Sequence, residues 1–294
     1  MTFWSIVRQR CWGLILVVAG VCIITFIISH LIPGDPARLL AGDRASDEIV
    51  QGIRQQLGLD QPLYIQFGRY VEALAHGDLG TSIRTGRPVA EDLKAFFPAT
   101  LELAFCSLLL ALVIGVPLGI LIVRHKWLAS PVLGIATIVL TIPSIALFGL
   151  MIPLFSLIGQ GIGALPAITA VFLYSLLPIV RNTHTALDSL PPGLREAGRG
   201  IGMTFWQRLR WVEIPMALPV IFGGIRTAVV MNIGVMAIAA VIGAGGLGLL
   251  LLNGIGGSDI RMLIAGALMI CLLAIVLDWL LHRLQVVLTP KGIR

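Results

Sequence analysis

Long apolar runs alternate with short polar stretches along most of the chain. We interpret six of these runs as membrane-spanning helices, because the hydrocarbon core of a bilayer requires about 20 consecutive apolar residues in a helix. They cover roughly residues 11–31, 99–123, 130–158, 165–181, 217–249 and 262–285. The fifth run is longer than one span requires, and its glycines between 243 and 248 predict a break near its far end. The pattern therefore predicts an all-α polytopic membrane protein.

One long polar segment, residues 32–98, separates the N-terminal segment and first span (1–31) from a core transmembrane domain (99–294). Ser46 predicts the start of a helix that stops at Gly58, and Pro62 predicts the start of a second helix. The second helix ends before Gly77 and carries an apolar stripe, made of Leu63, Phe67, Tyr70 and Leu74. We therefore expect residues 32–98 to fold into a small helical structure, the cap.

Composition supports a membrane protein. The chain has 294 residues, of which 57% are hydrophobic and only 12% are charged, whereas soluble domains carry about 25% charged residues. The four cysteines lie in or beside apolar runs and do not indicate a disulfide framework. No cleavable signal peptide is expected, because the apolar run after Arg10 is too long and no small-residue cleavage pattern follows it.

The basic residues predict the orientation, because short cytoplasmic loops of membrane proteins are enriched in lysine and arginine. If the N-terminus is cytoplasmic, the same side holds Arg8, Arg10, Arg124, Lys126, Arg181, Arg195, Arg199, Arg208, Arg210, Arg226, Arg283, Lys291 and Arg294. The short loops on the opposite face hold only Arg261. We therefore expect both termini in the cytoplasm and the cap outside. The net charge of +6 does not by itself indicate a nucleic-acid partner.

The polar segment 182–216 lies between the fourth and fifth spans and is expected on the cytoplasmic side. Gly202 predicts a break between two short helical pieces, and Thr204 followed by Gln207 has capping-box spacing. The second piece is expected to end before Pro215. It carries three large aromatic residues, Phe205, Trp206 and Trp211. Such residues on a water-facing loop favour a docking surface for another protein, although a basic interfacial segment on anionic lipid headgroups is the alternative.

The stretch "EAGRGIGMTFWQRLRWVEIP", residues 196–215, resembles a cytoplasmic-loop motif of ABC-importer permeases. That motif is Glu-Ala-Ala, three residues, glycine, nine residues, then Ile-x-Leu-Pro. The residues at matching spacing are Glu196, Ala197, Gly198, Gly202, Val212, Ile214 and Pro215. Gly198 stands for alanine, Val212 for isoleucine and Ile214 for leucine. The resemblance implies the type I importer permease fold, and a coupling helix that enters a groove of an ATPase through Glu196, Gly202 and Thr204–Trp206.

Two branches of that family are represented in the sequence. Residues 1–120 resemble the peptide/nickel branch through "LIPGDPARLL", "GDLGTSIRTGRPV" and "FPATLELA". Residues 112–294 resemble the quaternary-amine branch, which imports glycine betaine, choline or carnitine, through "GIATIVLTIPSIALFGLMIPL" and "AVIGAGGLGLLLLNGI". We favour a quaternary-amine cargo because the later spans are expected to line the path, and a di- or oligopeptide or nickel cargo remains the alternative.

The resemblance also implies partners: two cytoplasmic ATPases, a second permease subunit of the same or another kind, and an extracytoplasmic solute-binding protein, in a bacterial inner membrane. The chain is expected to bind no cofactor or metal, and ATP and Mg are used by the partner ATPase. No Gly-Lys-Ser or Gly-Lys-Thr occurs, and "GAGGLG" follows an apolar helix rather than a strand. The chain is therefore not expected to be an enzyme.

Candidate residues for the translocation path come from the interruptions of the apolar spans. Pro143 and Ser144 predict either an unwound turn or a packing kink in the third span. The full set is Pro143, Ser144, Asn232, Gly243, Gly245 and Gly246. The few charged residues within spans, Glu102, Arg226 and Asp278, lie near interfaces, which favours structural roles for them. This scarcity argues against a secondary transporter, and a membrane anchor for an ATPase remains an alternative.

Overall fold

The computed structural model describes residues 35–42, 45–82, 85–257, 259–290 and 292, and also residues 13, 16, 18–24, 26 and 27. Helices account for nearly all of the regular structure in these ranges, and their only strand-like feature is an isolated bridge between Thr81 and Pro88. The predicted all-α class is therefore confirmed.

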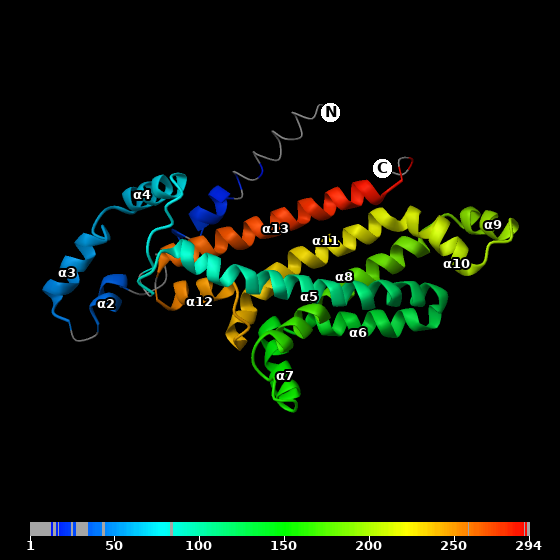
Figure 1. Cartoon of the computed structure of the whole chain (residues 1–294), viewed down its shortest axis with the longest axis horizontal. Coiled ribbons are helices and arrows are strands. Elements are labelled where there is room, and N and C mark those ends of the chain that lie inside the picture. The colour runs from blue at the N-terminus through cyan, green and yellow to red at the C-terminus, as the bar shows by residue number, and fades with distance from the viewer. Residues whose placement is uncertain are drawn as a thin grey trace. The chain divides into compact units, whose positions relative to one another are not determined.

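The helices follow one another along the chain as Figure 1 shows. Their bounds are α2 Pro36–Ala41, α3 Asp47–Gln56, α4 Leu63–Ala75, α5 Val89–Arg124, α6 Ala129–Thr141, α7 Ser144–Ser156, α8 Ala164–Asp188, α9 Pro192–Gly200, α10 Phe205–Arg208, α11 Ile214–Ala239, α12 Gly248–Gly256 and α13 Ile260–Leu288. Short turns of other helical types precede α6 (Lys126–Leu128), join α10 to α11 (Leu209–Glu213) and follow α11 (Ala240–Ile242).

Within the described ranges, four helical stretches are long and apolar enough to cross a membrane. They are Val89–Arg124, Ala164–Asp188, Phe205–Ile242 and Ile260–Leu288, and the bent pair Lys126–Thr141 and Ser144–Ser156 makes five if it counts as one span. These stretches correspond to the second to sixth predicted spans. The predicted first span, 11–31, lies largely outside the described residues.

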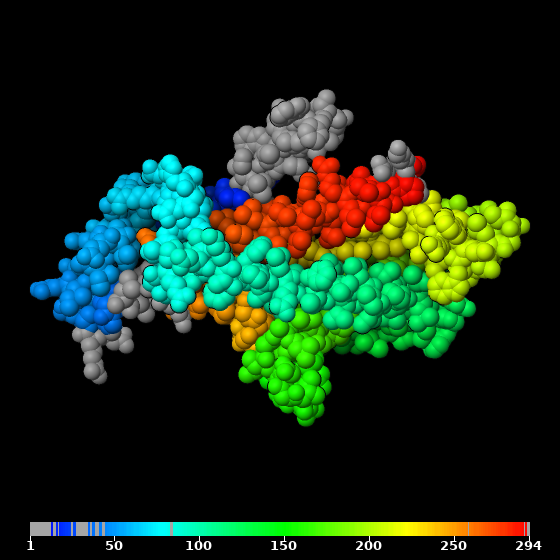
Figure 2. Space-filling view, in the orientation of Figure 1, coloured from blue at the N-terminus to red at the C-terminus, as the bar shows by residue number. Residues whose placement is uncertain are grey.

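The predicted third span is broken. The helices on either side of Ile142 and Pro143 meet at 102°. Proline disfavours helical geometry in the residue before it, and Ile142 is accordingly extended, with φ −65° and ψ 128°. The hydroxyl of Tyr174 on α8 donates a hydrogen bond to the Ile142 carbonyl oxygen. The break therefore has its exposed carbonyl paired within the protein, and Figure 2 shows α7, in bright green, standing clear of α6.

The chain divides into two compact units, residues 1–99 with 246–271 and residues 100–245 with 272–294. In the first unit, α5 residues Val89 and Leu93 pack against α12 and the start of α13. The predicted apolar stripe of α4 is buried only in part. Phe67, Tyr70 and Leu74 pack beside the cluster of Cys22, Phe26, Ile264 and Leu268, whereas Leu63 is 54% exposed.

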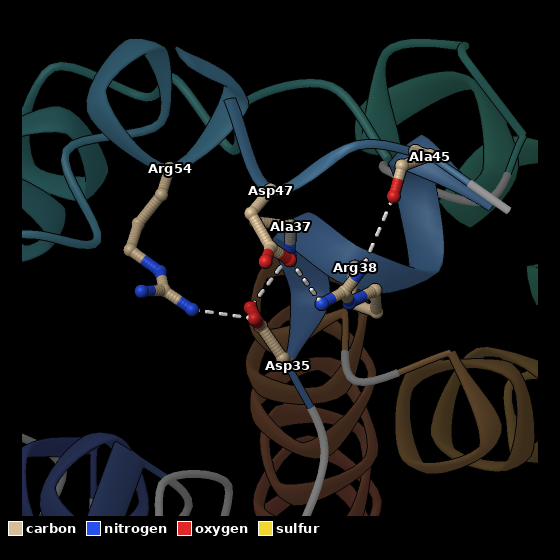
Figure 3. A network of polar contacts seen from close by, with 6 residues as sticks. All are labelled: Asp35, Ala37, Arg38, Ala45, Asp47 and Arg54. Atoms are coloured by element: carbon tan, nitrogen blue, oxygen red, sulfur yellow. Dashed lines mark hydrogen bonds and ion pairs between the residues drawn. The ribbon is translucent and has the colours of Figure 1, made fainter. Parts of the chain in front are cut away.

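The cap helices begin and end near the predicted positions. Ser46 precedes α3, although its side chain makes no capping hydrogen bond, and α4 runs from Leu63 to Ala75. Gly58 and Gly77 follow the two helices with φ of +67° and +76°, a left-handed geometry that favours glycine. Polar contacts join the first two cap helices, as Figure 3 shows: Arg54 to Asp35 at 2.5 Å and Arg38 to Asp47 at 2.7 Å.

In the second unit, α8 and α11 lie in close contact along an interface with small residues. A Cβ atom on Gly224 of α11 would lie 2.5 Å from the Cβ of Asn182 and 2.7 Å from the Pro178 carbonyl oxygen. Gly119 of α5 is equally confined, because its Cβ would lie 2.6 Å from the Cβ of Thr183. Small residues at such points let membrane helices approach closely, and this packing anchors α11 and the loop that precedes it.

Candidate functional site

The loop between α8 and α11 has the two-helix form that the sequence predicts. Helix α9 ends at Gly200, and Gly202 has φ +81°. The backbone N–H of Met203 donates to the Gly198 carbonyl oxygen at 3.0 Å, which closes the turn. A side chain at position 202 would be strained, since L-residues rarely adopt this backbone geometry. The predicted glycine break is therefore confirmed.

The predicted capping box is also present at the start of α10. The N–H of Thr204 donates to Gln207 Oε1 at 2.8 Å, and the N–H of Gln207 donates to Thr204 Oγ1 at 3.4 Å. The prediction that this helix ends before Pro215 is wrong. The helix continues through the wide turn Leu209–Glu213 into α11. Pro215 lies in the first turn of α11, where the widened turn already interrupts the regular ladder and a missing N–H leaves no bond unmade.

Two arginines and one glutamate hold the loop together from inside. Glu213 Oε1 lies 2.5 Å from Arg208 Nε, and the two side chains are only 3% and 9% exposed. Arg195 Nε lies 3.7 Å from the same oxygen, and Arg195 Nη2 donates to the Leu187 carbonyl oxygen at the end of α8 at 2.5 Å. The ion pairs therefore join α9, α10 and the turn into α11, and connect them to α8.

Gly198 leaves room for this arrangement. A Cβ atom at residue 198 would lie 3.2 Å from both Cγ and Cδ of Arg208 and 3.6 Å from the sulfur of Met203. A distance of 3.2 Å is tighter than ordinary van der Waals contact, so an alanine would require the Arg208 side chain to shift. The departure from the family motif at this position is therefore matched by the buried arginine packed over it.

The aromatic residues of the loop divide into inward and outward groups. Phe205 is half-buried beside the core, with the guanidinium carbon of Arg124 5.1 Å from its ring centroid. Trp206 and Trp211 are 65% and 67% exposed. Ile201, which sequence reasoning missed, is 75% exposed at the turn. The sequence signal for this exposed position is an isoleucine that stands directly before the predicted break at Gly202. The water-facing apolar surface of the loop is thus Ile201, Trp206 and Trp211.

The remaining motif residues follow the same division. Glu196 and Ala197 are exposed on α9, whereas Val212, Ile214 and Pro215 are half-buried. Ile214 packs beside the core of the second unit. Figure 1 shows α9 and α10 together beyond the N-terminal end of α11. The exposed part of the motif therefore lies on a short, braced projection that continues directly into a long helix.

The candidate path residues lie on three different elements. Pro143 lies in the break between α6 and α7, and Ser144 is the first residue of α7. Asn232 is buried on α11, where its Nδ2 donates to Ser175 Oγ of α8, and its Oδ1 has no hydrogen-bond partner among the described residues. The glycines Gly243, Gly245 and Gly246 all have φ near +75° and form the turn after α11. Gly243 packs so closely that its Cβ would lie 2.8 Å from Ile162 Cγ2.

Asn232 borders a cavity of about 310 Å³ between α5, α11 and α13. Its other lining residues are apolar: Leu101, Ala104, Phe105, Leu108, Val229, Ile233, Met236 and Leu277. Asn232 is thus the one polar residue among those that line this apolar space.

Sequence reasoning missed an ion pair within the spans. Arg226 of α11 binds Asp278 of α13 in bidentate form, at 2.7 and 2.8 Å, and Arg226 Nη1 lies 3.3 Å from His282 Nδ1. Glu102 is exposed on α5. Arg226 and Asp278 thus have the structural role expected of them, because their ion pair joins α11 to α13. Among the described residues, no three histidine, cysteine, aspartate or glutamate side chains lie close enough to hold a metal ion.

Long apolar helices joined to a braced loop with exposed tryptophans are typical of a membrane-spanning protein that binds another protein. Comparison with protein families matches residues 96–291 to the binding-protein-dependent transport system inner membrane component, and residues 3–104 to the N-terminal region of such membrane components. The chain therefore belongs to the family of binding-protein-dependent inner-membrane transport components. It is the permease subunit of an ATP-binding-cassette importer.

Relatives from both predicted branches match the chain. The osmoprotectant import permease OsmW of Salmonella typhimurium is 94% identical over 185 residues, which cover 63% of this chain and 86% of that protein. The probable D,D-dipeptide permease DdpB of Escherichia coli is 56% identical over 225 residues, covering 73% of this chain and 61% of that protein. The permease OpuCB of Bacillus subtilis, named for glycine betaine, carnitine and choline transport, is 41% identical over 194 residues, covering 66% and 87%. The prediction of two branches is thus confirmed.

A solved structure supports the fold. The inward-facing MetNI methionine ABC transporter contains a chain that matches with a TM-score of 0.62 and 28% sequence identity. The match covers 67% of this chain and 96% of that one. The matched two thirds of the chain therefore has the fold of an ABC importer permease.

Proposed function

We propose that residues 192–215 couple this permease to a cytoplasmic ATPase subunit. The observation that carries the proposal is the exposure of Trp206 and Trp211 on a loop whose interior is held by buried ion pairs. Large aromatic side chains contribute most of the affinity at many protein interfaces. Interior ion pairs hold them in a fixed position, which reduces the entropy lost on binding.

The continuity of the loop with α11 provides a route for movement. Because α10 passes into α11 through a helical turn without a flexible link, a displacement of α10 moves the start of α11 with it. Helix α11 packs on α8 and is paired with α13 through Arg226. ATP binding by the partner would bias these helices between inward-open and outward-open arrangements through differential contacts in the two states.

Substitution of the turn glycine tests the coupling role. Gly202→Val places a β-branched residue at φ +81°, where non-glycine residues cost about 1–2 kcal/mol. Gly200→Val is the matched control, because its Cβ would meet nothing within 4 Å and its φ is ordinary. We expect Gly202→Val to insert normally and to lose solute-stimulated ATP hydrolysis, with Gly200→Val active. Full uptake by Gly202→Val would rule out the role of the turn.

We infer a quaternary-amine cargo, such as glycine betaine or choline. The 94% identity with an osmoprotectant permease supports it, as does the chemistry of the cavity beside Asn232. A quaternary ammonium has no N–H to donate, so it suits walls that are largely apolar and include an aromatic ring, and the lining of this cavity is apolar apart from Asn232 and includes Phe105. A peptide ammonium would need an acceptor such as a carboxylate, and Asp278 is already paired with Arg226.

A di- or oligopeptide cargo is the second candidate, and the 56% identity with the D,D-dipeptide permease DdpB favours it. Uptake of labelled glycine betaine and a labelled dipeptide into proteoliposomes holding the whole complex separates the two. ATP-dependent uptake of glycine betaine that the dipeptide does not displace supports the quaternary-amine cargo. Uptake of the dipeptide alone refutes it.

The assembly follows from the same reasoning. We propose that two permease subunits, alike or different, form the path, together with two ATPases and an external binding protein. The chain then supplies no nucleotide site of its own, and ATP and Mg²⁺ are bound by the ATPase. We propose that both termini and the coupling loop face the cytoplasm and that the cap faces outward, because basic residues concentrate in the short loops of one side.

A further inference from the structure

The first unit contains a cavity of about 610 Å³ that none of the path residues line. Its walls come from the end of α3, from α4, from the loop after α4 and from the start of α13. The volume lies within the range of small-molecule sites, about 300–1,000 Å³. Unlike the cavity beside Asn232, it is lined by charged and polar groups as well as apolar ones.

Two guanidinium groups line this cavity, those of Arg69 on α4 and Arg261 on α13. Neither is in an ion pair with a carboxylate among the residues that the structure describes. Arg261 Nη1 donates weakly, at 3.4 Å, to the Thr81 carbonyl oxygen, so most of its N–H groups are left for a ligand. Guanidinium groups favour planar, bidentate partners such as carboxylates.

Tyr70 also lines the cavity. Its hydroxyl is buried and has no hydrogen-bond partner within the described ranges. Burial raises the pKa of the Tyr70 phenol, although the nearby positive charge of Arg261 opposes this rise. The hydroxyl therefore keeps its proton. Because the hydroxyl is closed to solvent, Tyr70 shapes the wall of the cavity, and the charged donors that a ligand can reach there are the two guanidinium groups.

The acid of the cavity is engaged locally. Asp78 Oδ1 accepts a hydrogen bond from the Gly80 N–H at 2.8 Å, which holds the loop turn. The two guanidinium groups still outnumber this one carboxylate in the lining of the cavity. Two glycines, Gly58 and Gly80, leave room for the arginine side chains. A Cβ on Gly58 would lie 3.2 Å from Arg69 Nη1, and one on Gly80 would lie 2.8 Å from Arg261 Cδ.

The loop that forms one wall is fixed by buried contacts rather than left loose. Ser82 Oγ donates to Asp259 Oδ2 at 2.8 Å, just before α13, and the Ser82 N–H donates to the Arg87 carbonyl oxygen at 2.8 Å. Both Ser82 and Asp259 are buried. These contacts hold the cavity wall to the helix that carries Arg261, so the site is largely preformed.

We propose that this cavity binds the carboxylate of a small organic solute, held by the guanidinium groups of Arg69 and Arg261. The site belongs to the external cap and the start of α13 and is separate from the coupling loop. The proposal does not depend on which cargo crosses the membrane, because none of the candidate path residues lines this cavity. It gives this region a ligand site in addition to any role in docking a partner.

Calorimetric titration of the full-length permease in lipid nanodiscs tests the site with three probes. Glycine betaine and choline share a trimethylammonium group, but only glycine betaine has a carboxylate, and alanylalanine has a carboxylate with a different remainder. We expect binding of glycine betaine and alanylalanine and not of choline. Arg69→Gln is expected to weaken both by at least about tenfold, the effect of losing a charge-assisted hydrogen bond.

Lys94→Gln is the matched control, because it removes one positive charge from an exposed position of the same unit that does not line the cavity. Arg69 is itself exposed, so its replacement is expected to leave folding intact, and thermal unfolding of each variant checks this. Equal binding of choline, or equal weakening by Lys94→Gln and Arg69→Gln, would overturn the proposal. So would a wild-type protein that binds no probe while Arg69→Gln weakens capture of the solute-binding protein, since the arginine would then serve that protein.

Discussion

Replacement of Glu213 by glutamine should loosen the coupling loop without disturbing the spans. Glu213 and Arg208 are 3% and 9% exposed and 2.5 Å apart. Breaking a buried ion pair by neutralising one partner costs about 3–5 kcal/mol, because the other charge stays buried without compensation. At about 1.4 kcal/mol for each factor of ten, the opened form of the loop should become about a hundred to a few thousand times more populated.

Hydrogen–deuterium exchange of the full-length protein in nanodiscs measures this directly. Amides of α10 and of the turn Leu209–Glu213 should exchange faster in Glu213→Gln by that factor, while α8 amides far from the loop stay protected. Glu102→Gln, which changes an exposed acid on α5, is the control and should exchange like the wild type. Unchanged exchange around α10 in Glu213→Gln would refute the inference that this ion pair holds the loop.

A double substitution separates charge loss from packing loss. Arg208→Met combined with Glu213→Leu removes both charges and keeps apolar volume. Such replacements of buried pairs are often neutral or stabilising, so the double variant should recover much of the lost protection. Equal exposure of the loop in the single and double variants would show that the buried charge left on Arg208 is not what opens the loop.

Two further predictions concern packing and pH. Gly224→Ala should lower the stability of the second unit by about 1–3 kcal/mol, because the new Cβ would lie 2.5 Å from the Cβ of Asn182. Gly223→Ala is the control and should be tolerated, because its Cβ would meet nothing within 4 Å. Equal melting temperatures of the two variants would contradict this. Burial raises the pKa of Asp35, but hydrogen bonds from Arg54 and the Ala37 N–H outweigh it, so the pKa lies below its ordinary value of 3.8. The α2–α3 contact should therefore be fully stabilised above that value and weaken as pH falls through the lowered pKa, and amide exchange in α3 should lose this pH dependence in Asp35→Asn.

Hydropathy predicted the long spans because each span is specified by residues that are consecutive in the sequence. Each apolar run specifies a helix by its own length, and Pro143 indicates in the sequence the point where the third span breaks. The capping box at Thr204 and the turn at Gly202 are likewise contained in a few consecutive residues. These features could be predicted because neighbouring residues alone decide them.

The features that sequence reasoning missed depend on distant residues. The pairing of Arg226 with Asp278 joins positions 52 residues apart, and no single-chain pattern links them. The inward position of Phe205 depends on Arg124 at the end of α5. The continuation of the helix past Pro215 depends on the widened turn before it, which no residue preference specifies. Tertiary contacts decide each of these.

The affinity of the full-length permease for its ATPase subunit tests the central claim most directly. Trp206→Ala combined with Trp211→Ala removes the two exposed aromatic side chains of the loop, and Trp127→Ala removes a third exposed tryptophan, between α5 and α6, as the control. We predict that the double variant loses at least about thirtyfold in affinity, as interface hot spots typically cost 2 kcal/mol or more, and that Trp127→Ala binds like the wild type. Wild-type affinity in the double variant would contradict the assignment of residues 192–215 as the coupling site.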